Sequence, residues 1–162
     1  MDRVRATASG LPVYGLFLAL CLAVAAAGSV ASSYGLAVWY PALTKPAFNP
    51  PGWLFAPVWT VLYIMLALAG ARLALSPARE KEPALSLYIA QLGLNAAWSW
   101  VFFYGQAIGA AAVVVCVLWL AIAATIWLAW TKDRMASLLL IPYLAWVSFA
   151  AVLNIAIWRL NG

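Results

Sequence analysis

The sequence predicts an all-α membrane protein, a bundle of five transmembrane helices that forms a single domain over residues 1–162. Hydrophobic residues make up 68% of the chain and charged residues only 8%. A soluble domain carries about 25% charged residues, so this chain has too few to cover a water-exposed surface. Apolar runs recur along the chain, each with the roughly 20 residues that a helix needs to cross a bilayer. Charged residues fall between these runs, where connecting loops would leave the membrane.

The five helices are expected over about 11–33, 52–75, 84–104, 107–131 and 135–160. The first carries small residues at intervals of four, which would allow close packing in lipid. Two such ridges are present: Ala19, Ala23 and Ala27, and Ala25, Ser29 and Ser33. A cleaved signal peptide is the alternative interpretation, because Ser-Val-Ala at residues 29–31 resembles a small-residue cleavage site. The apolar run is long for a signal peptide, and the chain that follows is itself membranous.

The segment from Trp39 to Trp53 interrupts the apolar pattern between the first two helices. It contains four prolines, two tryptophans, one tyrosine and one phenylalanine. Proline fixes φ and removes an N–H donor, so the segment cannot continue as a regular helix. Its aromatic content distinguishes it from a flexible linker. We expect an ordered loop at the membrane surface that caps a pocket, with four candidate ligand-binding residues: Trp39, Pro46, Phe48 and Trp53.

The second and third predicted helices carry further candidates. Trp59 and Tyr63 are four residues apart and therefore share a helix face. Gln91, Asn95 and Ser99 form a polar stripe, which in hydrocarbon must face protein or a cavity. This stripe would either hydrogen-bond a neighbouring helix or line a pocket, and both interpretations stay open. Another face of the same helix carries a pair of small residues, expected at a packing or dimer interface: Gly93 and Ala97.

The last two predicted helices differ in what they offer. The fourth is almost wholly aliphatic, and Trp127 and Trp130 near its end are typical of an interfacial aromatic belt. Pro142 in the fifth would introduce a kink. One helical stripe of the fifth holds the remaining ligand-binding candidates of that helix: Tyr143, Trp146, Ala150 and Leu153.

The basic residues predict the orientation in the membrane. Most of them fall at the end of the bundle that holds the amino terminus: Arg3, Arg5, Arg72, Arg79, Lys81, Lys132 and Arg134. Lys45 and Arg159 fall at the other end. Cytoplasmic loops are rich in Lys and Arg. We therefore expect a bacterial inner-membrane protein with a cytoplasmic amino terminus and with the Trp39–Trp53 loop outside.

The available chemistry is restricted by what the chain lacks. It contains no histidine, which removes the usual general base, metal ligand and haem ligand. Cys21 and Cys116 lie far apart in apolar runs and are expected to be buried small side chains without metal-ligand spacing. No acidic residue falls inside a predicted span, which disfavours a proton-coupled exporter. Basic residues are scattered singly, which disfavours nucleic acid as a partner. We expect no metal and no cofactor.

Aromatic side chains are the remaining resource for a binding site. The chain has 10 Trp, 7 Tyr and 6 Phe, more than interfacial belts require. Trp59, Trp98 and Trp146, with the loop aromatics, would line a cavity for a flat apolar ligand such as a metal-free porphyrin. Stacking on such rings contributes about 0.5–1.5 kcal/mol per aromatic pair. Trp59 and Trp146 are expected to flank the ligand, and Asn95 to hydrogen-bond its polar edge.

Several motifs, in this order, resemble the translocator protein family, also called the tryptophan-rich sensory protein or peripheral benzodiazepine receptor family. Trp39-Tyr40, Lys45-Pro46 and Pro50-Pro51 are similar to its W-Y-x-x-L-x-K-P-x-W-x-P-P signature. The resemblance covers the chain from about residue 11 to its end. Further matching positions are Pro57-Val58-Trp59, Leu62-Tyr63, Gln91-Leu92, Asn95, Trp98, Phe102-Phe103, Pro142 to Trp146, Phe149-Ala150, Leu153-Asn154 and Trp158-Arg159.

The resemblance implies a fold and a function. The fold is five transmembrane helices around a pocket capped by the first loop, in a homodimer packed partly through the third helix. The ligands are porphyrins such as protoporphyrin IX, cholesterol-like lipids in animal members, which occupy the mitochondrial outer membrane, and synthetic benzodiazepines and isoquinolines. The expected function is a sensory protein that regulates the export or breakdown of tetrapyrroles.

Two alternatives to the sensory function stay open. One is an enzyme that degrades porphyrin in light, with Trp59 and Trp146 as its catalytic candidates. The other is a passive transporter of lipids, sterols or porphyrins. Two departures from the family pattern bear on the ligand. Phe48 stands where the family usually has Trp, so the ring is kept and the indole N–H is lost. The cholesterol motif near the carboxyl terminus is broken at Ile155, which disfavours sterol binding by that route.

Overall fold

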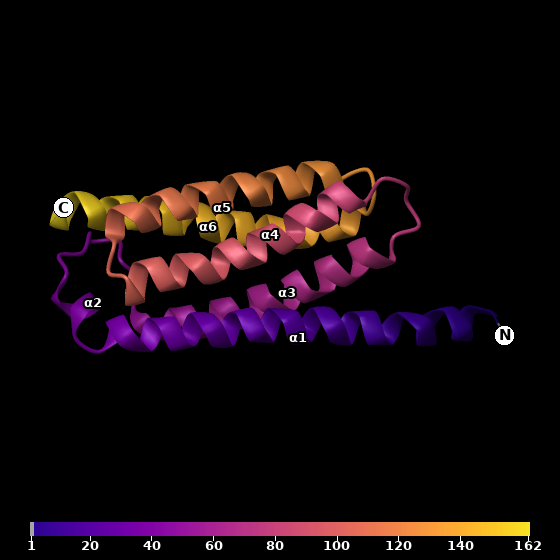
Figure 1. The fold of residues 1–162 in the computed structure, drawn as a ribbon, viewed down its shortest axis with the longest axis horizontal. Helices are drawn as coiled ribbons and strands as arrows, with labels where there is room; N and C mark the ends of the chain where they lie inside the picture. The colour runs from indigo at the N-terminus through magenta and orange to yellow at the C-terminus, as the bar shows by residue number, and fades with distance from the viewer. Residues whose placement is uncertain (1) are drawn as a thin grey trace.

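The computed structural model describes the backbone of residues 2–162 and the side chains from Gly10 onward. Within that range the chain is all-helical and contains no strand, as the sequence predicts. A 3-10 turn, Gly52–Leu54, precedes α3, and a π-helix, Trp100–Tyr104, continues α4. The six α-helices are α1 (Asp2–Leu36), α2 (Trp39–Ala42), α3 (Phe55–Leu75), α4 (Glu82–Ser99), α5 (Ile108–Ala129) and α6 (Arg134–Asn161) (Figure 1).

Four helical stretches are long and apolar enough to cross a membrane: Gly10–Leu36, Gly52–Leu75, Ile108–Ala129 and Arg134–Asn161. They correspond to four of the five spans expected from the sequence. The third expected span, 84–104, is divided between α4 and the π-helix. α4 alone has 18 residues, begins at Glu82 and carries two buried amides, Gln91 and Asn95. Its polar content explains why it falls outside the apolar set.

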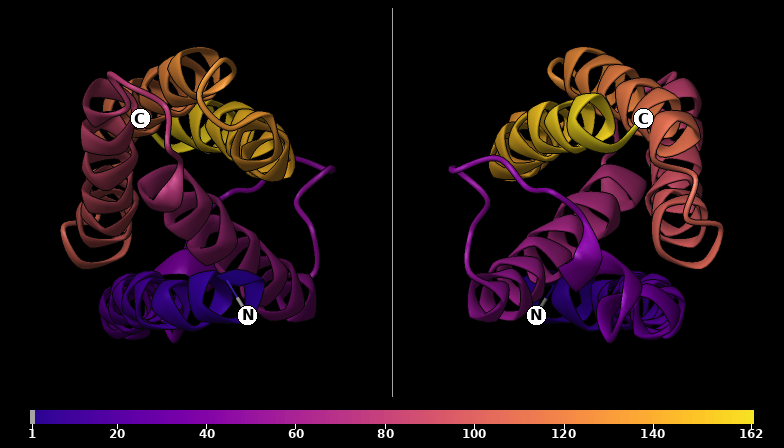
Figure 2. Two further views of the ribbon diagram at one scale, coloured as in Figure 1. Left: turned by 90° about the vertical axis from the view of Figure 1, so that its right-hand side faces the viewer. Right: turned by 90° about the vertical axis from the view of Figure 1, so that its left-hand side faces the viewer.

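The five long helices pack side by side around a common core. α1 contacts α3, α3 contacts α6, α6 contacts α5, α5 contacts α4, and α4 returns to α1. Seen along the bundle, α3 crosses between α1 and the α5–α6 pair (Figure 2). The amino and carboxyl termini lie at opposite ends of the long axis (Figure 1). The core contains buried side chains from all five helices, including Leu66, Leu92 and Val115.

α1 contacts the bundle through a different stripe from the one that the small-residue ridges predict. Phe17, Cys21 and Ala31 are buried, whereas Ala19 and Ala23 of the first ridge are exposed. Most residues of the two ridges are exposed in the single chain, so the close packing that they would allow stays a prediction. Phe17 packs on the Tyr88 ring, with centroids 5.7 Å apart. Since the small residues of the ridges recur all round α1, spacing alone could not identify the packed face.

One expectation is corrected. Cys116 is exposed on α5, so of the two free cysteines only Cys21 is the buried small side chain that was expected. The Trp39–Trp53 segment contains one turn of helix, α2, which ends after Ala42. Pro41 is tolerated there because N–H groups in a first helical turn have no intrahelical acceptor to lose.

Candidate functional site

Four side chains from three helices meet inside the bundle: Trp59, Tyr63, Asn95 and Tyr143. We call them the tyrosine–asparagine cluster. The Tyr63 hydroxyl on α3 donates to Asn95 Oδ1 on α4 at 2.9 Å. Asn95 Nδ2 donates to the Tyr143 hydroxyl on α6 at 2.8 Å. The Trp59 ring packs against both tyrosines, with centroids 5.3 Å from Tyr63 and 6.3 Å from Tyr143. Asn95 and Tyr143 are buried. Asn95 therefore hydrogen-bonds two neighbouring helices, which is one of the two roles expected for the polar stripe.

Gln91 lies one helical turn before Asn95 and is bonded differently. Its side chain is fully buried, yet neither Nε2 nor Oε1 has a hydrogen-bond partner among the described residues. A buried amide without a partner costs about 1–3 kcal/mol in proteins. Two residues of the same polar stripe therefore lie in opposite states, one fully paired and one unpaired.

A second group, the outer aromatic cluster (Phe48, Phe55, Trp146 and Phe149), lies between α3, α6 and the first loop. Trp146 packs against Phe55 of α3 and Phe149 of α6, with ring centroids 5.8 Å and 5.6 Å apart. Phe48 from the loop reaches Phe149 at 6.4 Å and is half exposed. Within the described residues these four side chains are joined by ring contacts alone. Their ring faces are consequently not fixed by hydrogen bonds.

A third group, the loop-anchoring cluster (Trp39, Tyr40, Trp98 and Phe102), attaches the first loop to the π-helix. Trp39 and Tyr40 pack on Phe102, with centroids 5.4 Å and 6.1 Å away, and Trp98 stacks on the same ring at 5.2 Å. The Trp98 indole N–H donates to Asn154 Oδ1 at 2.9 Å. Trp39 and Trp98 therefore hold the loop on the bundle. Their ring partners differ from those of Trp146, and the single cavity expected around Trp59, Trp98 and Trp146 stays a prediction.

Polar contacts also order this loop. The Tyr40 hydroxyl donates to Asn49 Oδ1 at 2.9 Å, and burial raises the pKa of the Tyr40 hydroxyl while this hydrogen bond lowers it less. Lys45 Nζ lies 5.0 Å from the Tyr40 ring centroid and donates to two loop carbonyls. Asn161 at the end of α6 donates to the Thr44 carbonyl and accepts from the Thr44 N–H. The segment is thus tied to itself and to α6.

The other predicted ligand-binding residues lie in the first loop, in the 3-10 turn and on α6. Trp53 is 73% exposed at the start of α3. Leu153 is buried beside Phe102, and Ala150 is half buried on α6. Pro46 and Phe48 line one side of an open groove of about 480 Å³ against the outer face of α6, where Ile155 also lies.

The proposed dimer residues lie on the outside of α4. A Cβ atom built on Gly93 would meet nothing within 4 Å, and Ala97 is half buried. This part of the α4 surface is therefore open in the single chain.

Sequence reasoning missed several residues of these clusters. Phe149 lies three positions after Trp146, so the same helical stripe signals it. Phe55 opens α3 and had no periodic signal of its own. Asn154 bonds both Trp98 and the Ile108 carbonyl, which joins α4, α6 and the start of α5. Such pairings across 46 and 56 residues leave no local pattern in the chain.

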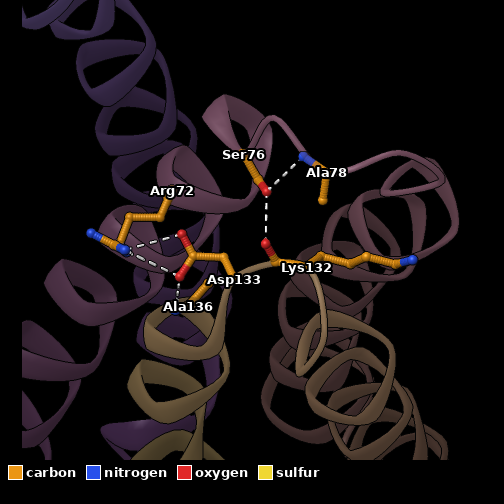
Figure 3. Close-up of polar contacts among 6 residues, drawn as sticks. All are labelled: Arg72, Ser76, Ala78, Lys132, Asp133 and Ala136. Atoms are coloured by element: carbon orange, nitrogen blue, oxygen red, sulfur yellow. Dashed lines mark hydrogen bonds and ion pairs between the residues drawn. The ribbon is translucent and has the colours of Figure 1, made fainter.

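The opposite end of the bundle carries a group of polar contacts that links two helix connections (Figure 3). Arg72 of α3 forms an ion pair with Asp133, with Nη2 3.1 Å from Oδ2. Asp133 also caps α6 by accepting from the Ala136 N–H at 2.9 Å. The Ser76 hydroxyl donates to the Lys132 carbonyl at 2.7 Å. These contacts join the α3–α4 and α5–α6 connections.

Comparison with known proteins gives consistent matches over almost the whole chain. A sequence model of the TspO/MBR family matches residues 17–159. Protein CrtK of Rhodobacter capsulatus is 36% identical over 149 residues, which cover 90% of this chain and 92% of that protein. Tryptophan-rich protein TspO of Chlorobaculum tepidum is 43% identical and covers 90% of this chain and 94% of its own length. The Homo sapiens translocator protein is 38% identical, with 93% and 90% covered.

Proposed function

The chain belongs to the TspO/MBR family and is an integral membrane protein, and from this premise we propose that it binds tetrapyrroles such as protoporphyrin IX. In this proposal the protein acts as a membrane sensor that regulates the export or breakdown of these flat apolar molecules. The names of the relatives, which include tryptophan-rich sensory protein and translocator protein, support a sensory or translocating role.

The proposal includes five membrane spans, with α4 and the π-helix together as the third. The 18 residues of α4 and the 5 of the π-helix follow one another without a break. At about 1.5 Å per residue they reach roughly 35 Å, enough to cross a hydrocarbon core of about 30 Å. The amides of α4 are compatible with this position because they face the bundle interior, where Asn95 is paired with two tyrosines.

The observation that carries the proposal is the outer aromatic cluster. Its rings are partly exposed and make apolar contacts without hydrogen bonds, so a flat ligand can replace one ring contact with another. Trp146 would stack on the ligand, and Phe48 would move from Phe149 to let it enter. Each ring pair would contribute about 0.5–1.5 kcal/mol beyond the burial of apolar area. Trp59 and Asn95, which lie deeper in the tyrosine–asparagine cluster, would meet the inner edge of the ligand.

Quenching of tryptophan fluorescence by protoporphyrin IX tests this proposal. We expect saturable quenching whose dissociation constant increases several-fold in Trp146→Phe and in Trp59→Phe. Trp127→Phe is the matched control, because Trp127 is 76% exposed near the opposite end of the bundle. Saturable quenching with the same constant in all three variants would remove these two tryptophans from the binding site.

Light-dependent degradation of the bound porphyrin is a second candidate function. The observation in its favour is the contact of Trp59 with two tyrosines, because an indole radical formed there could be reduced by a neighbouring phenol. Dioxygen would be the oxidant and the porphyrin would absorb the light. The test is the product spectrum under illumination in air. Equal products at equal rates in the wild type, Trp59→Phe and Trp146→Phe would reduce this activity to photochemistry of the free pigment.

We also propose a homodimer through the open α4 surface and an orientation with the amino terminus in the cytoplasm. A cysteine introduced at Gly93 tests the dimer: oxidation should link two copies in membranes, and a Cys116→Ala background removes the exposed native thiol.

A cysteine introduced at Thr44 tests the orientation: it should react with an impermeant reagent in intact cells. Reaction only after lysis would reverse the assigned orientation.

A further inference from the structure

An open groove lies at the end of α5, on the side of the bundle that carries most of the basic residues. It has a volume of about 540 Å³ and is lined by Ile126, Trp127, Leu128, Trp130, Thr131 and Lys132. Most of this lining is apolar, yet Trp127 is 76% exposed and Trp130 is 40% exposed. Two large indole rings therefore border a hollow that the rest of the described chain leaves uncovered.

The groove is edged by cations that pair with no acidic side chain from Gly10 onward. The Arg134 guanidinium lies over the Trp130 ring, 5.0 Å from the centroid, which fixes a positive charge beside the hollow. The Lys132 side chain extends away from the Arg72–Asp133 pair (Figure 3). Asp133 lies between these two cations in sequence, but it is engaged by Arg72 and by the amino terminus of α6. Among residues 10–162, Arg72–Asp133 is the one ion pair, and it includes neither Lys132 nor Arg134.

The position of the groove along the bundle matches the lipid headgroups. α5 has 22 residues and measures about 33 Å at roughly 1.5 Å per residue, close to the thickness of the hydrocarbon core. Its last turn and the α5–α6 connection therefore reach the headgroup layer. Tryptophan side chains prefer this layer, and Lys and Arg there attract anionic lipids.

We propose that this groove binds one anionic phospholipid. The first part of an acyl chain lies along the apolar wall formed by Ile126 and Trp127. The phosphodiester lies between Lys132 and Arg134, with Trp130 beneath the guanidinium. A lipid fits better than free phosphate because the lining is mainly apolar and the site opens at membrane depth. This assignment is independent of the tetrapyrrole proposal, since the outer aromatic cluster lies near the other end of the bundle.

Native mass spectrometry of the full-length protein in detergent tests the proposal. The probes are phosphatidylglycerol, phosphatidylcholine with the same acyl chains, and free glycerol phosphate. We expect one phosphatidylglycerol to bind in preference to phosphatidylcholine, and free glycerol phosphate not to displace it. The double variant Lys132→Gln/Arg134→Gln should weaken phosphatidylglycerol binding by about tenfold, because two cations next to the phosphate are lost. The matched control is Arg79→Gln, an exposed cation at the same end but outside the groove.

Several outcomes would overturn the assignment. Equal binding of the two phospholipids, or an unchanged preference in the double variant, would show that these cations do not select the lipid. Efficient displacement by free glycerol phosphate would make the site a phosphate site rather than a lipid site. Trp130→Leu gives a second measure if the double variant folds poorly. It keeps both cations and removes the ring under Arg134, so it should weaken phosphatidylglycerol binding to a smaller extent.

Discussion

The tyrosine–asparagine cluster and the outer aromatic cluster both contain a tryptophan packed on other rings, but they are held in different ways. In the first, two hydrogen bonds through Asn95 fix Tyr63 and Tyr143 in the bundle interior. In the second, Trp146 of α6 contacts Phe55 and Phe149 through its ring, and no hydrogen bond among the described residues fixes it. Hydrogen bonds are directional, whereas ring contacts tolerate displacement by ångströms. The first cluster is suited to holding helices together and the second to exchanging one ring for another.

The largest expected effect breaks the hydrogen-bonded cluster. Asn95→Leu leaves the Tyr63 and Tyr143 hydroxyls without their shared partner in the interior of the bundle. We expect the free energy of unfolding to fall by about 2 kcal/mol, a value near the upper range for membrane hydrogen bonds. Thermal unfolding in detergent measures it. The control Tyr63→Phe removes only one of the two bonds and should cost less; an equal loss in both variants would contradict a shared role for Asn95.

The second prediction addresses the outer aromatic cluster. Phe48→Trp enlarges the loop ring that contacts Phe149 and restores the indole that the family usually carries. We expect protoporphyrin IX to bind about threefold more tightly, because a larger ring covers more of a flat ligand. Phe48→Ala should weaken binding by about the same factor or more. Since Phe48 is half exposed, neither change should alter the unfolding temperature by more than a few degrees. Unchanged affinity in both variants would separate the loop from the ligand.

The third prediction compares two amides on one helix. Gln91→Met removes a buried amide that has no partner among the described residues, and it keeps the side-chain length. We expect the free energy of unfolding to rise by about 1 kcal/mol, because the desolvation penalty of the amide is relieved. Thermal unfolding of the ligand-free protein measures this change. A loss of stability would show instead that Gln91 is bonded by a buried water.

These two amides also show what the sequence could and could not predict. Gln91 and Asn95 lie four residues apart on one helix, so the sequence assigns them to one stripe, and both are buried in the structure. Only the fold brings Tyr63 and Tyr143, which lie 32 and 48 residues away in the chain, to Asn95. Helix limits were easier to predict. The second helix was expected over 52–75, and the 3-10 turn and α3 occupy Gly52–Leu75, because prolines and apolar length act locally.

The sequence named the aromatic candidates, but it could not predict how their rings group in the structure. Trp59, Trp98 and Trp146 were expected around one cavity, since aromatic content says nothing about which rings face one another. In the structure Trp98 hydrogen-bonds Asn154 and stacks on Phe102 in the loop-anchoring cluster. Trp59 packs on tyrosines, and Trp146 on phenylalanines. The separation depends on side-chain direction around three helices, which no spacing rule fixes when two faces of a helix are apolar.

The smallest expected effect concerns the loop-anchoring cluster at high pH. Burial raises the pKa of Tyr40 above its value in the unfolded chain, so the folded protein keeps the phenol proton at a pH where the unfolded chain loses it. The stabilisation from this group is therefore complete below about pH 10 and falls as pH rises through the folded pKa. Tyr40→Phe cannot titrate, so the difference in unfolding temperature between wild type and variant should shrink from pH 8 to pH 11. A constant difference would mean that deprotonation of Tyr40 does not loosen the loop, and that ring packing on Phe102 and Phe103 holds it without the hydroxyl.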